Sequence, residues 1–254
     1  MKSLFALFII IIPSIVFAQQ DSVLSGPYKW IQPAMKINKL ESAVLLEGKV
    51  HDFEWMQINA NTIGGSKKIK QKVSREQELL IIIKSGLANI HFGDSTFLLT
   101  PNSVAVLMPG EKFTLTNAEN GFCNFYTMKY RSKASLGMKK LPVSNSYVRL
   151  WESIEYKLNN IGGGRRDFFQ QSTAMQKRFE MHVSTLKEGI RSHEPHTHRA
   201  EEIVLIIDGD TEMQIGQQFF KTNPGGFYYL GSNVPHAVKN AGTKPSTYFA
   251  FQFE

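Results

Sequence analysis

Apolar and polar positions along the chain alternate over short stretches that are separated by turn residues. Residues 55–63 alternate with a period of two, whereas residues 79–83 and 203–207 are continuous apolar runs. Gly-Asp and Pro-Gly pairs punctuate these stretches at short intervals. Short strands at this spacing predict an all-β sandwich or barrel. The continuous run at 203–207 predicts a strand that is buried on both faces, one toward the interior of its own barrel and one toward a second sheet or a partner.

The second half of the sequence repeats the first half at a constant offset of 123 residues. Glycine, proline and aromatic positions coincide without a gap: Gly209 with Gly86, Gly216 with Gly93, Phe220 with Phe97, Pro224 with Pro101 and Leu230 with Leu107. A fixed period of this kind indicates two copies of one structural unit. We therefore predict an N-terminal domain at residues 19–131, a linker at 132–148 and a C-terminal domain at 149–254.

The first 18 residues have the pattern of a secretory signal peptide. Lys2 is followed by an apolar core, and Val16-Phe17-Ala18 offers small residues at a cleavage position. The apolar run is too short to favour a membrane span. We expect a secreted or periplasmic protein that has no membrane association after cleavage.

Composition restricts the remaining chemistry. Cys123 is the only cysteine, so no intramolecular disulfide can form. The formal net charge is +7, and part of it lies in a basic run at residues 67–75. No nucleic-acid motif and no interleaved aromatic residues accompany that run, so a solvated basic segment is favoured over a polyanion site. Phosphate-loop, serine-elbow and Cys-x-x-Cys motifs are absent from the sequence.

Three histidines and one glutamate form a candidate metal site in the second copy. His196, His198 and Glu202 are separated by two and four residues, and His236 follows a later turn. Imidazole and carboxylate groups bind Zn, Mn, Fe, Ni or Cu. The even spacing suits a strand whose alternate side chains leave one face.

The repeat offers an internal test of this candidate site. At the offset of 123 residues, the four positions coincide in the first copy with Val73, Arg75, Leu79 and Phe113. The turn and core positions are kept in the first copy while all four ligand types are missing. The fold therefore does not need them, and we predict a metal-free first domain and a metal-binding second domain.

The run Gly-x6-His-x-His-x3-Glu-x6-Gly at residues 189–209, followed by Pro-His at 235–236, resembles the two motifs of the cupin superfamily. Gly231 and Asn233 stand where that family more often has Pro and Gly, and Asn tolerates the positive φ that such a turn requires. The resemblance implies two tandem cupin domains, each a double-stranded β-helix or jelly roll. It also implies one divalent ion, Mn, Fe, Zn or Ni, with one or two open positions for substrate or water.

Four other residues are candidates for contacts with a small-molecule substrate. Arg178 and His182 share one face of a predicted strand, where Arg178 suits a carboxylate; a solvated or interdomain face is the alternative. Gln214 and Tyr228 lie on strands near the predicted site, and each is equally compatible with a packing role. The sequence assigns no catalytic residue.

One metal-free and one metal-binding half resemble the architecture of the ureidoglycine aminohydrolase family, which differs in its metal ligands. The His-His-Glu-His set is instead similar to that of germins and quercetin-type dioxygenases. The first hypothesis is a metal-dependent hydrolase, lyase or isomerase acting on a small oxygen-rich molecule, such as a sugar acid or a ureido acid. The alternatives are a quercetinase-type dioxygenase and a metal-stabilised binding protein without turnover. The resemblance is also compatible with a homodimer.

Overall fold

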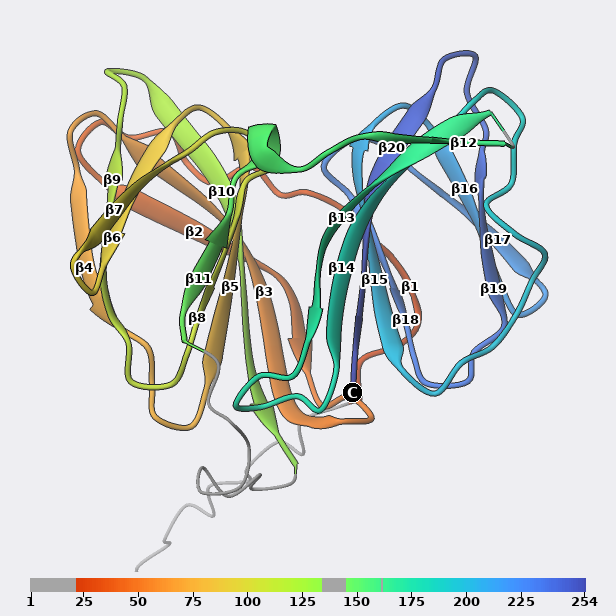
Figure 1. Cartoon of the computed structure of the whole chain (residues 1–254), viewed down its shortest axis with the longest axis horizontal. Coiled ribbons are helices and arrows are strands. Elements are labelled where there is room, and N and C mark those ends of the chain that lie inside the picture. The colour runs from red at the N-terminus through yellow and green to blue at the C-terminus, as the bar shows by residue number, and fades with distance from the viewer. Residues whose placement is uncertain (1–21, 134–144, 161) are drawn as a thin grey trace, which may run out of the picture.

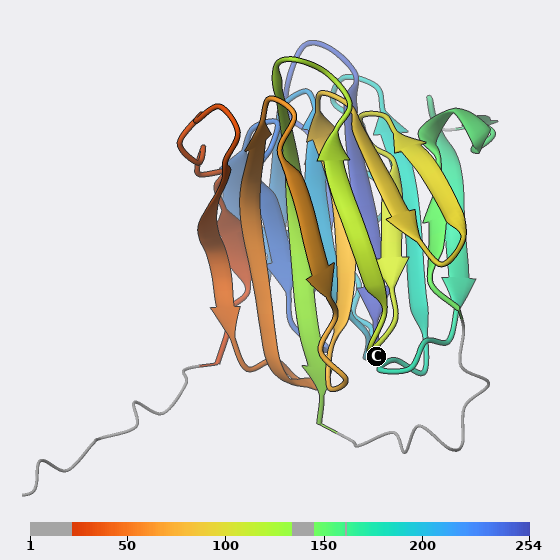
Figure 2. The ribbon, with the colours of Figure 1, turned by 90° about the vertical axis from the view of Figure 1, so that its left-hand side faces the viewer.

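The computed structural model describes residues 22–133, 145–160 and 162–254. Within these ranges the strands form four sheets that build two barrels side by side, with most of the first half of the chain in one and most of the second half in the other (Figure 1). Each barrel has a larger inner sheet facing its counterpart and a smaller outer sheet. Figure 2 looks onto the outer sheet of the first barrel. Within the described ranges, no helix has the length and apolar character needed to span a bilayer.

The first barrel follows the alternation read from the sequence. Its inner sheet has the order β11-β8-β5-β10-β3-β2 and its outer sheet the order β4-β9-β6-β7. The strands from the first half of the chain are β1 (Gly26–Tyr28), β2 (Leu40–Gly48), β3 (Phe53–Gly64), β4 (Lys68–Lys72), β5 (Glu78–Ser85), β6 (Ala88–Phe92), β7 (Ser95–Leu99), β8 (Val104–Leu107), β9 (Lys112–Asn117) and β10 (Phe122–Ser132).

The second barrel repeats this arrangement with the orders β1-β18-β15-β20-β14-β13-β12 and β17-β16-β19. The remaining elements are β11 (Tyr147–Arg149), a 3-10 turn η1 (Trp151–Ser153), β12 (Lys157–Asn159), β13 (Gly163–Gln171), β14 (Phe179–Leu186), β15 (Glu201–Asp208), β16 (Thr211–Ile215), β17 (Gln218–Thr222), β18 (Phe227–Leu230), β19 (His236–Asn240) and β20 (Ser246–Phe253). Strands β13, β15, β16, β17 and β18 lie at the 123-residue offset from β2, β5, β6, β7 and β8. The predicted all-β fold with a duplicated barrel is confirmed.

Two short strands exchange partners between the halves. β1 pairs with β18 of the second barrel, and β11 pairs with β8 of the first. Because β18 and β8 are equivalent in the repeat, the exchange is reciprocal. The division into domains at 19–131 and 149–254 therefore differs from the membership of the sheets: Gly26–Tyr28 completes the second sheet, and Tyr147–Arg149, at the end of the predicted linker, completes the first. The predicted signal peptide and residues 134–144 lie outside the described residues.

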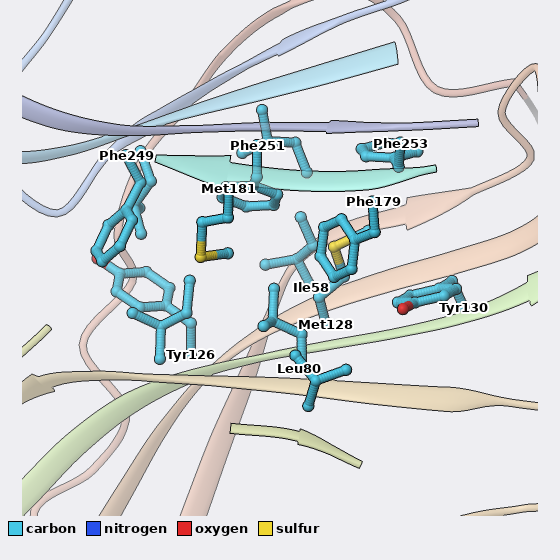
Figure 3. Packing of buried hydrophobic residues seen from close by; sticks show 14 of the residues in the cluster. Ile58, Leu80, Tyr126, Met128, Tyr130, Phe179, Met181, Phe249, Phe251 and Phe253 are labelled. Carbon is cyan, nitrogen blue, oxygen red and sulfur yellow. The ribbon is translucent and has the colours of Figure 1, made fainter. Parts of the chain in front are cut away.

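A continuous apolar cluster fills the space between the two inner sheets (Figure 3). Ile58, Leu80 and Met128 contribute from the first barrel, and Met181 and Phe251 contribute from the second. The five are at most 4% exposed. A fully buried side chain of this size contributes about 1.5–3 kcal/mol. An interface of this kind resembles a domain core and makes the two barrels one packed unit.

Two buried carboxylates link the barrels across this interface. Glu78 accepts hydrogen bonds from Tyr130 of its own barrel and from the Thr173 hydroxyl (2.8 Å) and Met175 N–H (2.8 Å) of the other. Glu201, its equivalent in the repeat, accepts from Tyr229. Glu201 also accepts from the backbone N–H groups of residues 51 (2.8 Å) and 52 (3.0 Å) in the first barrel. Buried carboxylates need such donors, and these two cross-links are related by the same pseudo-symmetry as the sheets.

Candidate metal centre

The four predicted ligands converge at one end of the second barrel. His196 and His198 precede β15, Glu202 is its second residue, and His236 begins β19. A two-way backbone pair joins His196 to His236, with N–H to carbonyl distances of 3.2 and 3.1 Å. The even spacing of His196 and His198 predicted a strand, which is wrong. Both lie in a loop that this single bridge fixes against β19.

The distances within the group fit a common ligand. One ligand atom from each of His196, His198 and His236 lies within 4.8 Å of the others. Glu202 Oε2 lies 3.1 Å from His198 Nε2 and 3.2 Å from His236 Nε2. The side chain of His236 is 4% exposed, and that of Glu202 is 9% exposed. The site is buried at His236 and Glu202 and exposed at His196. This arrangement suits an ion that has protein ligands on its buried side and free coordination positions toward solvent.

The tautomers of the rings test whether these residues fit a cation. His198 Nδ1 lies 2.7 Å from the Ala200 carbonyl, and His236 Nδ1 lies 2.8 Å from the Val234 carbonyl. A carbonyl only accepts, so each Nδ1 carries the proton, and each neutral ring turns its Nε2 lone pair toward Glu202. Lone pairs and a carboxylate that converge in this way require positive charge between them, supplied either by a proton or by a metal ion. Hydrogen bonds from backbone carbonyls are the usual means of orienting histidine ligands. The residues therefore fit a metal.

The electrostatics of the group are consistent with a place for a cation. The hydrogen bond to Glu202 raises the pKa of His198. Burial alone raises the pKa of Glu202, but the hydrogen bonds that the protonated rings of His198 and His236 donate to it outweigh burial and hold that pKa below its ordinary value. Burial and the neighbouring imidazoles, His193 first among them, lower the pKa of His196. Protons and a metal ion would compete for the same lone pairs, so the affinity for metal falls as the pH falls.

Two residues outside the ligand set support the loops that carry it. His193 Nδ1 lies 2.9 Å from His196 Nδ1, with ring centroids 4.0 Å apart, although His193 is exposed. Asn233 has φ +59° and donates its backbone N–H to the His198 carbonyl at 2.8 Å. The expectation that Asn233 takes up positive φ is confirmed. The turn before His236 is thereby tied to the loop of His198.

Strand register identifies the wall beside the ligands. Alternate residues of the inner sheet face the barrel interior in rows that cross from strand to strand. The row of Glu202 contains Glu180, Gln252 and Leu230, and the next row contains His182, Ala250, Val204 and Tyr228. Phe179, Met181 and Val183, on the opposite face of β14, pack in the interface between the barrels. The face that carries Arg178 and His182 is thus the interior one, and the interdomain alternative is wrong.

Arg178 and His182 differ in their availability to a substrate. Arg178 forms an ion pair with Glu180, which also accepts from Arg165 Nη2 at 3.2 Å. A ligand must therefore share the guanidinium with that carboxylate. His182 Nδ1 is buried without a hydrogen-bond partner, and the nearest carboxylate oxygen, on Glu180, is 3.7 Å away. Burial, reinforced by Arg165, lowers the pKa of His182 to about 4, so its ring is neutral and can accept or donate a proton.

Gln214 and Tyr228 do not reach the ligands. Gln214 lies on the opposite face of β16 from the core residue Met213 and donates to the Gly216 carbonyl in its own turn at 3.2 Å. Tyr228 faces the interior one row deeper than Glu202, but its hydroxyl is held by Thr211 O (3.0 Å) and Phe220 O (3.2 Å). Its side chain is fully buried. Neither side chain contacts the ligand residues, and the burial of Tyr228 agrees with the packing alternative; a substrate contact by either residue stays a prediction.

Gln252 is a site residue that sequence reasoning missed. Its Nε2 lies 3.3 Å from both His198 Nε2 and Glu202 Oε2. An amide N–H that faces His198 Nε2 is a donor facing a lone pair, which agrees with the tautomer assigned above. The sequence offered a signal for Gln252, because it is the one amide among the mostly aromatic residues 248–253. Its contact with His198 and Glu202 could be known only from the strand register.

Apolar residues occupy three of the four ligand positions in the first barrel. Val73, Leu79 and Phe113, the equivalents of His196, Glu202 and His236, are buried and belong to the core of that barrel. The carboxylate that pairs with two histidines in one copy is thus replaced by a leucine in ordinary core contact in the other.

Comparisons with known proteins support the fold. Residues 182–251 match the cupin domain family. No curated protein matches the chain. Among solved structures, AerE from Microcystis aeruginosa is 15% identical, with a TM-score of 0.67 over 89% of this chain and 98% of that one. Oxalate decarboxylase from Bacillus subtilis is 12% identical (TM-score 0.65; 93% and 78% covered), and that from Lactobacillus farciminis in complex with formate is 10% identical (0.65; 92% and 88%). The chain therefore folds as two tandem cupin domains.

Proposed function

We propose that the second barrel holds one divalent metal ion on His196, His198, Glu202 and His236 and is a metal-dependent enzyme for a small, oxygen-rich acid. The convergence of three imidazoles and a buried carboxylate at an open barrel end carries this proposal. When bound, the ion supplies a Lewis acid that polarises a carbonyl or carboxylate. Hydrolysis, lyase chemistry and isomerisation are the reaction classes that such polarisation serves, in a compartment outside the cytoplasm.

The wall beside the ligands supports an acidic substrate. Arg178 lies close enough to influence the pKa of His198 and is a third exposed, so its free N–H groups can orient a carboxylate. His182 offers a neutral, unpartnered Nδ1 in the next row of the same face. We assign Arg178 to binding of the substrate and His182 to holding or moving a proton at Nδ1.

The known structures of similar fold are compatible with this substrate class. Two of them are oxalate decarboxylases, one of which was solved with formate, and Mn(II) centres are described for the Bacillus subtilis enzyme. Their identity to this chain is too low to transfer the reaction. Mn is accordingly one of the ions to test, together with Fe, Zn and Ni, and a sugar acid or a ureido acid is as suitable a substrate as a dicarboxylate.

Metal analysis followed by a substrate screen tests the proposal. Protein purified from its own host is assayed for metals, and the reconstituted protein is incubated with dicarboxylates, sugar acids, ureido acids and flavonols while products are followed by NMR. We expect about one ion per chain and turnover of a small acid. Loss of a flavonol with uptake of O2 would favour the dioxygenase alternative, whereas redox-inert zinc would weigh against it.

Two variants and one control variant distinguish an enzyme from a binding protein. His198→Ala should lose both metal and turnover, while His91→Ala, which removes an exposed histidine of the first barrel, should keep both. His182→Asn should keep metal but lose turnover, because only the proton-transferring nitrogen is removed. Substrate binding without turnover in the wild-type protein, for every acid that binds, would contradict the enzymatic assignment.

A further inference from the structure

The first barrel, which lacks the four ligand residue types at the equivalent positions, has a cavity of its own between its two sheets. The cavity has a volume of about 120 Å³. Leu79 and Phe113 form part of its apolar lining, while Asn59, Thr127 and Lys129 line it with polar groups. Ser42, Asn61 and Gln71 add further polar groups to the lining. Polar groups in a barrel interior require a partner, so this lining needs an explanation.

Strand register places these polar groups where the second barrel has its site. Lys129 pairs with Leu79 across β10 and β5, as Gln252 pairs with Glu202 across β20 and β15. Asn59 occupies the position of His182, and Thr127 pairs with it across β3 and β10. The first barrel thus carries a lysine ammonium in the row where the second barrel carries its metal ligands.

The ammonium of Lys129 has no acidic partner among the described residues. The ion pairs found in residues 22–133, 145–160 and 162–254 do not include it. The nearby carboxylate of Glu47 is occupied by Trp55 Nε1 and Gln57 Nε2, each at 2.9 Å. A half-buried cation without a counterion, beside a cavity, attracts an anionic group.

Two neighbouring groups define what the rest of a ligand must offer. Asn59 Oδ1 is buried without a hydrogen-bond donor. Thr127 Oγ1 accepts from Asn61 Nδ2 at 3.0 Å, which leaves its own proton to donate. The cavity therefore presents a cation, a hydroxyl donor and an amide acceptor in a lining that is partly apolar and partly polar. A carboxylate satisfies the first two groups, and a hydroxyl on the adjacent carbon satisfies the third.

We propose that the first barrel is a binding site for a small hydroxycarboxylate, separate from the metal site of the second barrel. Its size sets the scale of the ligand, because an apolar cavity of about 150 Å³ holds benzene. A hydroxy acid with about six or seven heavy atoms, such as lactate or glycerate, matches the cavity. Lys129 binds the carboxylate, and Asn59 accepts a hydrogen bond from the hydroxyl.

Titration calorimetry of the full chain with lactate and glycerate tests the proposal. The protein is stripped of metal with a chelator, and the same titrations are made with His198→Ala. We expect one saturable site per chain in both proteins. Propionate, which lacks the hydroxyl, and lactamide, which lacks the charge, should each bind about tenfold more weakly than lactate. This selectivity needs no variant of the cavity and so does not depend on whether a variant folds.

Substitutions then locate the site. Lys129→Gln should weaken lactate at least about tenfold, whereas Lys68→Gln, an equal change of charge on β4 outside the cavity, should leave it unchanged. Asn59→Leu should abolish the preference for lactate over propionate. Wild-type protein that binds none of these acids overturns the proposal. Binding that survives Lys129→Gln, or that disappears in His198→Ala, would also overturn the proposal, because the acid would then bind elsewhere. The metal site is tested separately, by the metal content of the protein.

Discussion

The two barrels share most of their strands in the same order, but their chemistry at the same end is opposite. In the second barrel, His196, Glu202 and His236 gather around a place for a cation. In the first, Val73, Leu79 and Phe113 are part of the hydrophobic core. The frame therefore tolerates either filling, and a cupin barrel does not require metal ligands for its strands to pair. Four experiments sharpen or break this comparison, from the largest expected effect to the smallest.

Removal of one histidine ligand should have the largest effect. Structural Zn²⁺ bound by four protein groups is held by about 10–16 kcal/mol, so His198→Ala should cost about 3–4 kcal/mol, or several hundredfold in metal affinity. Competition with a chromogenic chelator measures this, with His91→Ala as the control. The circular dichroism of the strands should not change. A metal affinity equal to that of the wild type would remove His198 from the ligand set.

Truncation of Phe113, the equivalent of His236 in the first barrel, should lower the stability of the protein and leave its metal affinity unchanged. Phe113 is 6% exposed in the core of the first barrel, so Phe113→Ala should lower the free energy of unfolding by about 3 kcal/mol. His236→Ala, at the matching position, should cost less when both proteins are compared without metal. Chemical denaturation in the presence of a chelator measures both. Equal losses of unfolding free energy would mean that His236 and Phe113 contribute equally to the packing of their barrels.

The turn before the last ligand should show a smaller effect. Asn233 has φ +59° where the first copy has Gly110 at +83°. Asn233→Gly should leave stability nearly unchanged, whereas Asn233→Ala should cost about 1 kcal/mol because a Cβ without a polar group disfavours this conformation. Thermal unfolding of the pair measures the difference. Metal affinity should follow the same order, because the Asn233 N–H binds the His198 carbonyl; an alanine variant as stable as the glycine variant would contradict this.

The smallest effect concerns pH and the interface between the barrels. Burial raises the pKa of Glu78, although hydrogen bonds from Tyr130, Thr173 and the backbone of Met175 partly offset it. The folded protein then holds this proton to a higher pH than the unfolded chain does. Its contribution to stability is therefore present below the ordinary pKa of glutamate and is lost as the pH rises through the raised value.

Glu78→Gln should accordingly flatten the change in melting temperature between acidic and neutral pH, by a few degrees at most. Glu76→Gln, an exposed neighbour on the same chain segment, should keep the wild-type profile. A Glu78→Gln profile that runs parallel to the wild type would show that this carboxylate does not set the slope.

Sequence pattern was sufficient for the elements and for the asymmetry between the halves. The alternation at 55–63, the apolar run at 203–207 and the 123-residue repeat predicted strands and a duplicated barrel, because strand periodicity and turn chemistry are local properties. The four candidate metal ligands were identified from their residue types and spacing, and the repeat then separated them from the residues that the fold requires. Their absence from the first copy needed no coordinates.

Tertiary structure alone decided which side chains meet. The exchange of β1 and β11, the carboxylates of Glu78 and Glu201 that cross the interface, and the contact of Gln252 with His198 all join residues far apart in sequence. Gln214 and Tyr228 lay on the predicted strands. Gln214 points away from the barrel core and the hydroxyl of Tyr228 is held by a backbone carbonyl, so neither side chain contacts the ligand residues. Pairing register and the packing of one sheet on another set these distances, and neither is encoded in the local sequence of a single strand.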